Sequence, residues 1–280
     1  MKKVTVVIPV YDEADVIAAC LRSLSEQRYE DFEIIVVDDG SSDKTWQVLS
    51  KLKVESVKLK VFKQEHKGPG AARNLGAKYA SGDILVFVDA DMTFDKDFIT
   101  NLVKPINQGK SKGTFSKEEY VSNWENVWAR CFNINQGWGD KVRHPANYPD
   151  EQKVFRAILK SEFIKVGGFK PGGYTDDYSL SDKLGYLATA AKSAKFFHTN
   201  PESLWETFNQ ARWSGKRRYK LGKVGYLAAL LRASFPVSFV LGLYKSLKFK
   251  TPAFLLYKCL YDFGVIIGIF EYLFFDKAAK

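Results

Sequence analysis

Strand-like and helix-like stretches alternate through the first third of the chain. Four short runs rich in β-branched and aromatic residues are each followed by polar residues: VTVVIPV, EIIVV, VKLKVFK and ILVFV. Between them apolar residues recur at a helical spacing, first at Val16, Ile17, Cys20, Leu21 and Leu24. Strands separated by single helices are typical of βαβ units. The pattern therefore predicts an α/β fold with a mostly parallel sheet flanked by helices.

The pattern changes after the fourth run. It weakens from residue 109 to residue 149, where a helix is expected at about residues 117–132. Residues 157–169 predict a strand, a short helix and a turn. Two apolar stretches then follow, at residues 224–247 and 253–275. They predict a C-terminal apolar helical hairpin.

Composition and cysteine usage narrow the class of protein. With 46% hydrophobic and 26% charged residues, a sizeable core is expected. Three cysteines without CxxC spacing argue against a disulfide framework or a thiolate zinc site, and they fit a reducing compartment. Lys2 and Lys3 precede an apolar run, but it is short and lacks a cleavage site, so a first strand is expected rather than a signal peptide.

Charged and polar side chains come after the expected strands. Four such clusters are IPVYDE (residues 8–13), VVDDGSSDKT (36–45), GPGAARNLG (68–76) and VFVDADM (86–92). In open α/β sheets, ligands bind beyond the carboxyl ends of the strands. We therefore expect these clusters to line one site.

In this order and spacing, the four clusters resemble the motifs of family 2 glycosyltransferases with the GT-A fold. Such enzymes transfer a sugar, with inversion, from a nucleoside diphosphate. The resemblance covers residues 1–215 and implies that Asp91 binds a divalent cation, Mg²⁺ or Mn²⁺. It implies that Asp89 contacts the ribose or, through water, the metal. Hard oxygen ligands select these cations, and a dication stabilises the departing diphosphate.

The same resemblance implies nucleotide contacts from the first three clusters. The residues implied for base and ribose are Pro9, Tyr11, Glu13 and Asp39. Arg73 is implied for the diphosphate. Two alternatives stay open: Asp38 or Asp39 caps the following helix, or Arg73 is a solvated surface residue. Asp12 stands where the family commonly has Asn.

The segment GGFKPGGYTDDYSLSDKLG carries the expected acceptor chemistry. In the family an acidic pair, usually Glu-Asp, opens a helix here, and its second member deprotonates the acceptor. That role falls to Asp177, with Asp176 in place of Glu, and a well-placed base is worth about 10² to 10⁴ in rate. Alternatively, the pair only begins a helix and interacts with its dipole.

A later segment, FFHTNPESLWETFNQARWSGKRR, contains the Arg-Trp element of the family. Arg212 is expected to bind a phosphate and Trp213 to form an acceptor wall. The longer Gln-x-x-Arg-Trp version marks processive polymerases, and Asn209 in place of its Gln argues against a polymerase. His198 either lies near the phosphates or is structural.

Two rival interpretations concern other classes of protein. VFVDADMT also resembles the first motif of haloacid-dehalogenase-like phosphatases, with Asp89 as nucleophile and Asp91 as acid/base. That motif normally ends the first strand, whereas three βα units precede it here. The other rival is a non-catalytic nucleotide-binding scaffold. GPGAARN is neither GxGxxG nor a Walker motif, so dinucleotide and ATP sites are not expected.

The net charge of +10 lies in one late segment. Between residues 207 and 261 there are eleven basic and no acidic residues, which leaves 31 basic and 32 acidic residues elsewhere. This asymmetry favours an anionic partner. Because long apolar stretches surround the basic residues, we expect a membrane surface and not nucleic acid.

This segment could lie on a membrane surface, enter one leaflet or span the bilayer. The longest uncharged run, residues 233–244, falls short of the roughly 18 residues of a spanning helix. A spanning hairpin would also place Lys245, Lys248 and Lys250 across the membrane from a cytosolic domain, against the positive-inside tendency. An interfacial or re-entrant hairpin in an anionic leaflet is therefore favoured. Spanning, or packing against the catalytic domain or a second copy, stays open.

Together these observations predict a metal-dependent inverting glycosyltransferase at the cytoplasmic face of the cell membrane. A catalytic domain is expected at residues 1–215 and a membrane-associating helical segment at residues 216–280. The expected partners are a nucleoside diphosphate sugar, a lipid-linked phosphate or surface-glycan acceptor, and an anionic membrane. The sequence does not indicate which sugar is used or an oligomeric state.

Overall fold

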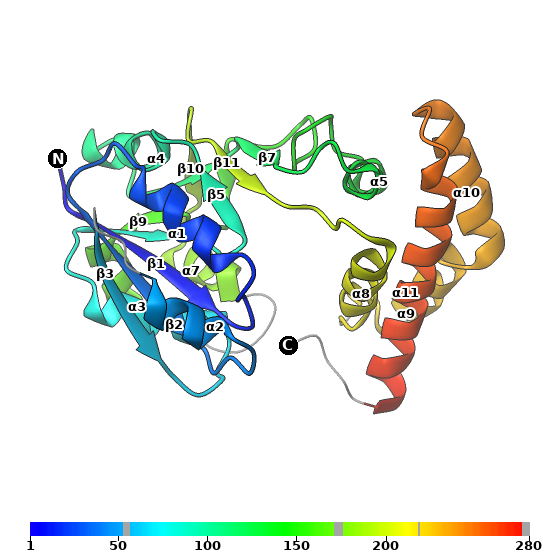
Figure 1. The fold of residues 1–280 in the computed structure, drawn as a ribbon, viewed down its shortest axis with the longest axis horizontal. Coiled ribbons are helices and arrows are strands. Elements are labelled where there is room, and N and C mark those ends of the chain that lie inside the picture. The colour runs from blue at the N-terminus through cyan, green and yellow to red at the C-terminus, as the bar shows by residue number, and fades with distance from the viewer. Residues whose placement is uncertain (53–56, 171–175, 218, 276–280) are drawn as a thin grey trace. The chain divides into compact units, whose positions relative to one another are not determined.

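The computed structural model of the chain describes residues 1–52, 57–170, 176–217 and 219–275 (Figure 1). The chain divides into two compact units. The first unit comprises Met1–Tyr120 and Asn147–His198, and the second comprises Val121–Ala146 and Thr199–Lys280. The boundaries of these units differ from those of the expected domains, because a helix that ends at residue 215 packs with the C-terminal helices and belongs to the second unit.

An eight-stranded sheet forms the centre of the first unit. Its strand order is β3–β2–β1–β4–β9–β6–β10–β8. Four mutually parallel strands are β1 (Val4–Val10), β2 (Phe32–Asp38), β3 (Lys58–Lys63) and β4 (Ile84–Phe87). The others are β6 (Gly113–Ser116), β8 (Glu151–Gln152), β9 (Ala157–Leu159) and β10 (Ala188–Ala191). β9 runs antiparallel to β4 and β6, β10 runs parallel to β6, and β8 is antiparallel to β10.

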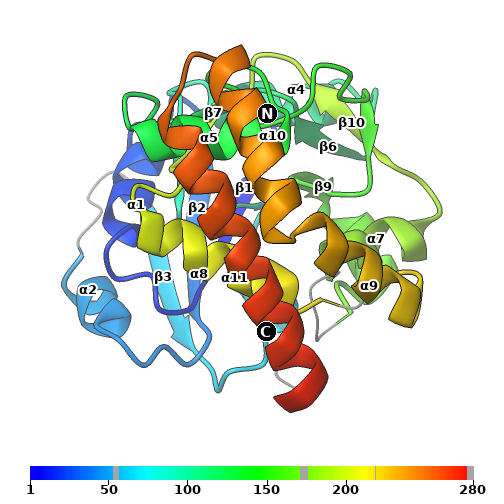
Figure 2. The same cartoon turned by 90° about the vertical axis from the view of Figure 1, so that its right-hand side faces the viewer.

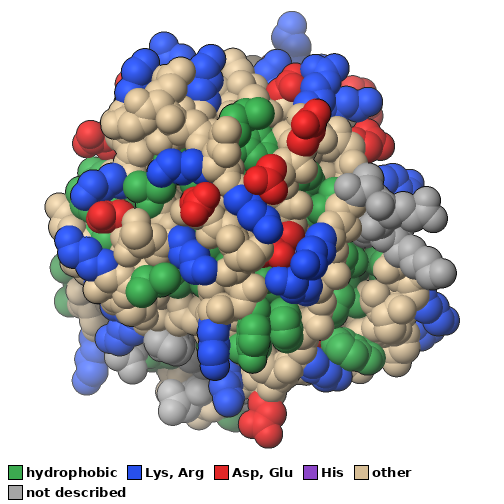
Figure 3. Space-filling view, turned by 90° about the vertical axis from the view of Figure 1, so that its left-hand side faces the viewer, with side chains coloured by type: hydrophobic (Ala, Val, Ile, Leu, Met, Phe, Trp, Pro, Cys, Tyr) green, Lys and Arg blue, Asp and Glu red, His purple; other side chains and the backbone are tan. Residues whose placement is uncertain are grey.

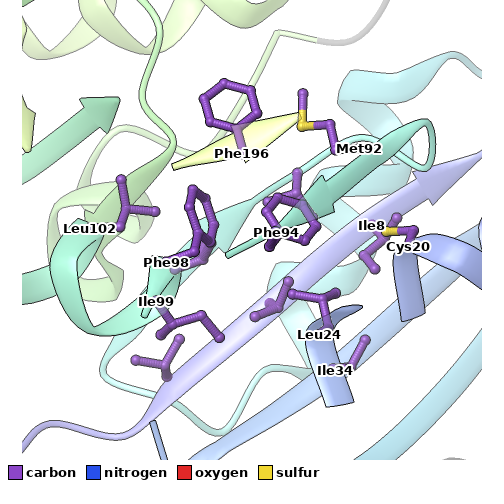
Figure 4. Packing of buried hydrophobic residues seen from close by; sticks show 14 of the residues in the cluster. Ile8, Cys20, Leu24, Ile34, Met92, Phe94, Phe98, Ile99, Leu102 and Phe196 are labelled. Atoms are coloured by element: carbon purple, nitrogen blue, oxygen red, sulfur yellow. The ribbon is translucent and has the colours of Figure 1, made fainter. Parts of the chain in front are cut away.

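Helices cover both faces of this sheet, because apolar residues of its central strands point to both sides. On one face, even-numbered residues of β1 such as Ile8 pack with α1 (Ile17–Ser25), α2 (Thr45–Lys51) and α4 (Phe98–Asn107). Figure 4 shows Ile8, Cys20 and Leu24 within this core. On the other face, Val7 packs with helices α3 (Pro69–Tyr79), α6 (Lys160–Lys165) and α7 (Asp176–Leu184). A Cβ at Gly76 of α3 would clash with the Val7 side chain, so α3 lies close against β1.

A second, three-stranded sheet corrects one prediction. Its order is β5–β11–β7, formed by β5 (Met92–Phe94), β11 (Phe196–His198) and β7 (Glu119–Val121). The helix expected at about residues 117–132 is therefore wrong in its first half. Helix α5 (Val127–Gln136) begins only after Asn126, whose side chain accepts hydrogen bonds from the N–H groups of Trp128 and Ala129.

The second unit is helical. Besides α5 it contains α8 (Leu204–Gly215), α9 (Gly222–Arg232), α10 (Phe235–Lys248) and α11 (Ala253–Phe275). α11 lies against α8 and α10 (Figure 2). The contact with α8 is close because of its glycines: a Cβ at Gly264 would lie 2.7 Å from the Phe208 carbonyl oxygen.

The predicted apolar stretch at residues 224–247 is two helices, α9 and α10, bent by 55°. α11 has 23 residues and a mean hydropathy of 1.7. By length and composition α11 is suited to crossing a membrane. Within the described ranges, α9 and α10 would provide a second such segment if the bent pair is treated as a single span.

Candidate active site

Two loops at the carboxyl end of the parallel strands are joined by hydrogen bonds. Asp12, which follows β1, has a positive φ of 55°. Its carboxylate accepts hydrogen bonds from the backbone N–H groups of Ser42 (2.7 Å) and Asp43 (3.2 Å), which follow β2. The N–H of Glu13 donates to the Thr45 hydroxyl at 2.8 Å. Asn and Asp both tolerate positive φ and accept such bonds, so Asp12 makes contacts that an Asn could also make at this position.

Asp39 organises a third loop, the one between β3 and α3. The carboxylate is buried and accepts hydrogen bonds from the N–H groups of Lys67 (2.9 Å) and Gly68 (2.8 Å). The Gln64 amide donates to it at 2.6 Å, and His66 Nδ1 lies 3.0 Å from it. Asp39 therefore holds the loop that precedes α3 and does not cap α2, which was the alternative interpretation.

The first turn of α2 is held by another aspartate. Asp43 accepts a hydrogen bond from the Thr45 N–H at 2.8 Å, and Asp38 accepts one from the Ser41 N–H at 2.9 Å. The loops approach one another closely at Gly40, whose φ is +78° and where a Cβ would lie 2.8 Å from the His66 backbone nitrogen. Glycine is therefore required there on two counts.

An aromatic pair lies over these loops. The Tyr11 and His66 rings have centroids 4.2 Å apart and are tilted by 40°. Tyr11 is 44% exposed, so part of its ring is open to a ligand. Pro9 lies two residues before Tyr11, within β1, where it is half-buried and paired with Val37 of β2. The exposed ring face is suited to stacking against a planar base.

Asp89 is held between two arginines. Its Oδ1 accepts a hydrogen bond from Arg73 Nη2 at 2.8 Å, and its Oδ2 accepts one from Arg156 Nη1 at 3.0 Å. Burial alone would raise the pKa of Asp89, but the charges of Arg156 and Arg73 outweigh burial and keep this pKa well below its usual range. Arg73 is 5% exposed, which excludes the alternative of a solvated surface residue.

Arg156 was missed by the sequence analysis. It directly precedes β9, and its N–H donates to the Thr114 carbonyl oxygen of β6 at 2.9 Å. No motif marks it. The available signal was a single charge inside the apolar segment VFRAIL, since a buried charge requires a partner.

The carboxylate of Asp91 is more open to solvent than that of Asp89. The Asp91 side chain is 48% exposed, and its Oδ1 lies 3.3 Å from Nε2 of the buried His198. His198 Nδ1 lies 2.6 Å from a Glu119 carboxylate oxygen. The pairing of β11 with β5 sets His198 opposite Met92, which explains its place beside Asp91. His198 thus bridges two acids, and Glu119 was missed by the sequence analysis.

Glu13 reports the electrostatics of the cluster. Burial raises the pKa of Glu13 to about 7, and the nearby charges of Asp91 and Asp89 add to this effect. A cation would relieve this repulsion. Among the residues that the structure describes, three or more His, Cys, Asp or Glu side chains do not converge in a ready-made metal centre. The open carboxylate of Asp91 nevertheless fits a cation that takes one or two carboxylates together with phosphate oxygens.

The remaining predicted residues belong to helices α7 and α8. Asp176 and Asp177 begin α7, but their side chains lie outside the described residues. Arg212 and Trp213 belong to α8 in the second unit. Arg212 Nε donates to Glu271 at 2.9 Å and Nη2 makes a second contact with the same carboxylate, so its guanidinium is already paired. Trp213 is 39% exposed.

Comparisons with known proteins agree with this arrangement. A family model described as glycosyl transferase family 2 matches residues 5–170. Glycosyltransferase GlyA of Streptococcus pneumoniae is 36% identical over 216 residues, which are 66% of this chain and 29% of that protein. Poly-beta-1,6-N-acetyl-D-glucosamine synthase of Staphylococcus aureus is 26% identical over 229 residues, 76% of this chain and 54% of that protein. The chain thus spans less than two thirds of the length of these relatives.

Solved structures share the fold over nearly the whole chain. S. aureus TarS 1–349 in complex with UDP-GlcNAc has a TM-score of 0.59 at 17% identity and covers 97% of this chain and 91% of its own. The mannosyltransferase PcManGT from Pyrobaculum calidifontis, in complex with GDP-Man and Mn²⁺, has a TM-score of 0.59 at 19% identity and covers 99% and 88%. At these identities the likeness concerns the fold, and it confirms the predicted α/β architecture of the GT-A type.

Proposed function

The chain belongs to glycosyl transferase family 2, and we propose that it transfers a sugar, with inversion, from a nucleoside diphosphate to an acceptor hydroxyl at the cytoplasmic membrane face. As a member of this family it is a glycosyltransferase. The metal, the donor, the acceptor and the location are the proposed parts. The phosphatase alternative is not favoured, because Asp89, its required nucleophile, has both oxygens hydrogen-bonded to arginines.

One observation carries the proposal. At the carboxyl ends of neighbouring parallel strands, Glu13 lies close enough to Asp89 and Asp91 for their charges to raise its pKa, and two arginines contact Asp89. Carboxylates attract a divalent cation, and arginines bind phosphate oxygens in a bidentate manner. A group that is both anionic and metal-binding, such as a diphosphate, matches this mixture of charges.

A divalent cation, Mg²⁺ or Mn²⁺, fits the residues present. Asp91 would hold the cation, because its carboxylate is open to solvent. Asp89 would act indirectly, by holding the guanidinium groups of Arg73 and Arg156 beside the site. When bound, such a cation supplies positive charge that stabilises the departing diphosphate. The Mn²⁺ in the PcManGT complex supports the choice of metal.

The donor is proposed to be a nucleoside diphosphate sugar. Two structural neighbours are complexes with UDP-GlcNAc and with GDP-Man, which supports this class. In this chain the exposed Tyr11 ring would stack on the base, next to Pro9. Asp39 would support that subsite by fixing the loop at residues 64–68.

Acceptor activation is proposed for Asp177. α7 begins at Asp176, so Asp177 is a residue of its first turn, and a helix dipole favours the deprotonated, basic form of a carboxylate in that position. Arg212 and Trp213 stay proposals as acceptor contacts, and for Arg212 a phosphate would have to compete with Glu271. The acceptor is proposed to be a lipid-linked phosphate or a surface glycan, given the apolar and basic second unit.

The test combines nucleotide sugars, metals and two matched pairs of variants. The protein is incubated with a panel of UDP-, GDP- and TDP-sugars with Mn²⁺, Mg²⁺ or EDTA, and release of nucleoside diphosphate is measured. EDTA and Asp91→Asn should each lower release at least 100-fold. Asp97→Asn is the matched control, because Asp97 follows Asp91 closely in the sequence and its side chain forms an exposed ion pair with Arg28.

The base is tested within a single helix. Asp177→Asn should lower kcat by about 10² to 10⁴ with an unchanged donor KM. Asp182→Asn serves as the control, since Asp182 lies in the same helix and pairs with Lys153 on the surface. Metal-independent release, or equal rates for the two α7 variants, would refute the corresponding part of the proposal.

A further inference from the structure

In helix α10 the distribution of buried and exposed side chains is the reverse of that in a surface helix of a water-soluble protein. Its buried positions are Ser238, Gly242 and Ser246, spaced four apart, and all three are small. Its exposed positions include Phe235 and Leu247, which are 69% and 72% exposed. A surface helix in water buries its large apolar residues instead. The exposed side of α10 is therefore suited to apolar surroundings.

The polar groups of the α10–α11 hairpin gather inside it. Asp262 of α11 accepts a hydrogen bond from the Ser238 hydroxyl at 2.5 Å and pairs with Lys258 at 2.8 Å. All three side chains are buried. Small residues and hydrogen-bonded polar groups at helix contacts, with large apolar groups outside, are the arrangement that a lipid environment favours.

Helix α9 extends the same apolar surface. Val224, Leu227 and Leu231 recur on one side of it and are 66%, 59% and 62% exposed. α9 leads into α10 through the 55° bend, and Figure 2 shows the two helices following one another along one side of α11. We call the exposed apolar faces of α9 and α10 the apolar ledge.

Basic residues lie at both ends of the apolar ledge. Lys223 is in the first turn of α9, Arg232 lies at the bend, and Lys248 ends α10. α10 has 14 residues and is therefore about 21 Å long, which is shorter than the hydrocarbon core of about 30 Å. If α10 lies parallel to the membrane, Arg232 at one end and Lys248 at the other reach the headgroups of the same leaflet. By contrast, the face of the first unit in Figure 3 mixes acidic and basic side chains.

α11 is long enough to cross a bilayer, but its partner α8 is unsuited to one. The second half of α11 packs against α8 through Gly264 and Gly268, and Glu271 pairs with Arg212 and Lys216. Crossing the membrane would carry the polar side chains and ion pairs of α8 into hydrocarbon, which is costly. α11 is better explained as the inner layer that supports the apolar ledge.

We propose that the apolar ledge lies flat in one leaflet of an anionic membrane, with lipid phosphates bound at its ends and α11 held on the protein side. The partner is a phospholipid surface with net negative charge. This inference does not depend on sugar transfer, so a failure of the proposed catalytic function leaves it intact.

Vesicle flotation tests the partner. The full chain is mixed with phosphatidylcholine vesicles that contain either 30% or no phosphatidylglycerol. Binding to the anionic vesicles is expected, and the variant Lys223→Gln/Lys248→Gln should weaken it at least tenfold, since each surface cation contributes about fivefold. The control Lys110→Gln/Lys165→Gln makes the same charge change in the first unit.

Apolar insertion has its own matched pair. Val240 of α10 is 64% exposed and belongs to the apolar ledge together with Phe235. Phe235→Ser/Val240→Ser should also weaken binding at least tenfold, whereas Ile164→Ser, at a 62% exposed position of the first unit, should leave it unchanged. A chain that binds neither vesicle, or one that dimerises in solution and loses the dimer with Phe235→Ser/Val240→Ser, would overturn the proposal in favour of a protein partner.

Sidedness distinguishes a flat ledge from a spanning hairpin. Cys259 is replaced by Ser first, because it is half-buried whereas Cys20 and Cys131 are buried. In this background, Lys223→Cys and Lys248→Cys are labelled with an impermeant maleimide on sealed vesicles to which the chain has been added. Both should react fully without detergent, and alkaline carbonate should release the chain. Protection of Lys248→Cys until the vesicles are permeabilised would show spanning and overturn the proposal.

Discussion

Asp89 binds Arg73 with one carboxylate oxygen and Arg156 with the other, although Arg156 lies 67 residues after Asp89 in the chain. The carboxylate keeps both guanidinium groups in the cluster that also contains Glu13 and Asp91. At the scale of single residues, the candidate site therefore depends on an arginine that has no place in any recognisable motif.

Arg156→Gln tests that dependence. Loss of the charged hydrogen bond should lower kcat/KM for the donor about 10- to 100-fold, because bonds to charged groups contribute about 1.5–3 kcal/mol. Steady-state kinetics with the donor varied would measure it. Arg28→Gln, which removes only an exposed ion pair with Asp97, is the control. Donor kinetics that are the same for both variants would show that Arg156 is not needed.

Glu33 gives a pH-dependent prediction at the opposite end of the sheet. This buried carboxylate accepts hydrogen bonds from Ser81 and Thr5 and pairs with Lys60. Burial opposes ionisation, but the hydrogen bonds from Ser81 prevail and lower the pKa of Glu33 to about 2.

Since the unfolded chain binds its proton near the ordinary pKa of 4.5, the stabilisation by Glu33 is present above pH 4.5 and is lost as the pH falls toward 2. It amounts to about 3 kcal/mol. Urea unfolding at several pH values should show wild-type stability falling over this window, and Glu33→Gln should have a much shallower slope. Equal slopes would contradict the assignment.

These residues show where sequence reasoning ends. Asp89, Asp91 and Arg73 were found because they lie in motifs directly after strands. Arg156 and Glu119 come from segments that fold back to the site from far along the chain, and their spacing carries no local pattern. Long-range pairs of this kind are created by tertiary packing alone.

At the scale of elements, the periodicities were reliable where both faces of the sheet are covered. β1, β2, β3 and β4 and the helices between them follow the predicted order, because alternation and helical spacing persist over whole elements. The prediction failed at residues 117–132, where β7 is only three residues long. So short a strand carries too little alternation to be distinguished from a helix.

Gly76 permits a prediction about element packing. A Cβ there would meet the Val7 side chain, so Gly76→Ala should push α3 from β1 and lower the free energy of unfolding by about 1–3 kcal/mol. The double variant Gly76→Ala/Val7→Ala should lose less than the sum of the two single variants, because removing the Val7 methyl groups makes room. Additive losses in urea unfolding would contradict this contact.

At the scale of the whole molecule, the second unit is assembled from two separate stretches of chain. Cys131 and Phe132 of α5 form a small core with Phe254 and Tyr257 of α11. The predicted domain at residues 1–215 contains only half of this core. The sequence pattern does not reveal the shared core, because its halves lie on either side of a segment that belongs to the first unit.

A fragment that ends at residue 215 should therefore behave poorly. It would retain α5 and α8 but lack α11, which leaves their apolar faces uncovered. We expect stronger binding of a hydrophobic dye and aggregation at micromolar concentration, measured beside the full chain. A monomeric fragment that binds no more dye than the full chain would support residue 215 as a domain boundary.

The shared core also bears on biosynthesis. α5 leaves the ribosome about 120 residues ahead of the α11 residues that cover it. At translation rates of 5–20 residues per second, that interval is roughly 6–25 s. During this time the apolar residues of α5 are not covered by α11. Chaperones that bind nascent chains could therefore bind this surface before the second unit has folded.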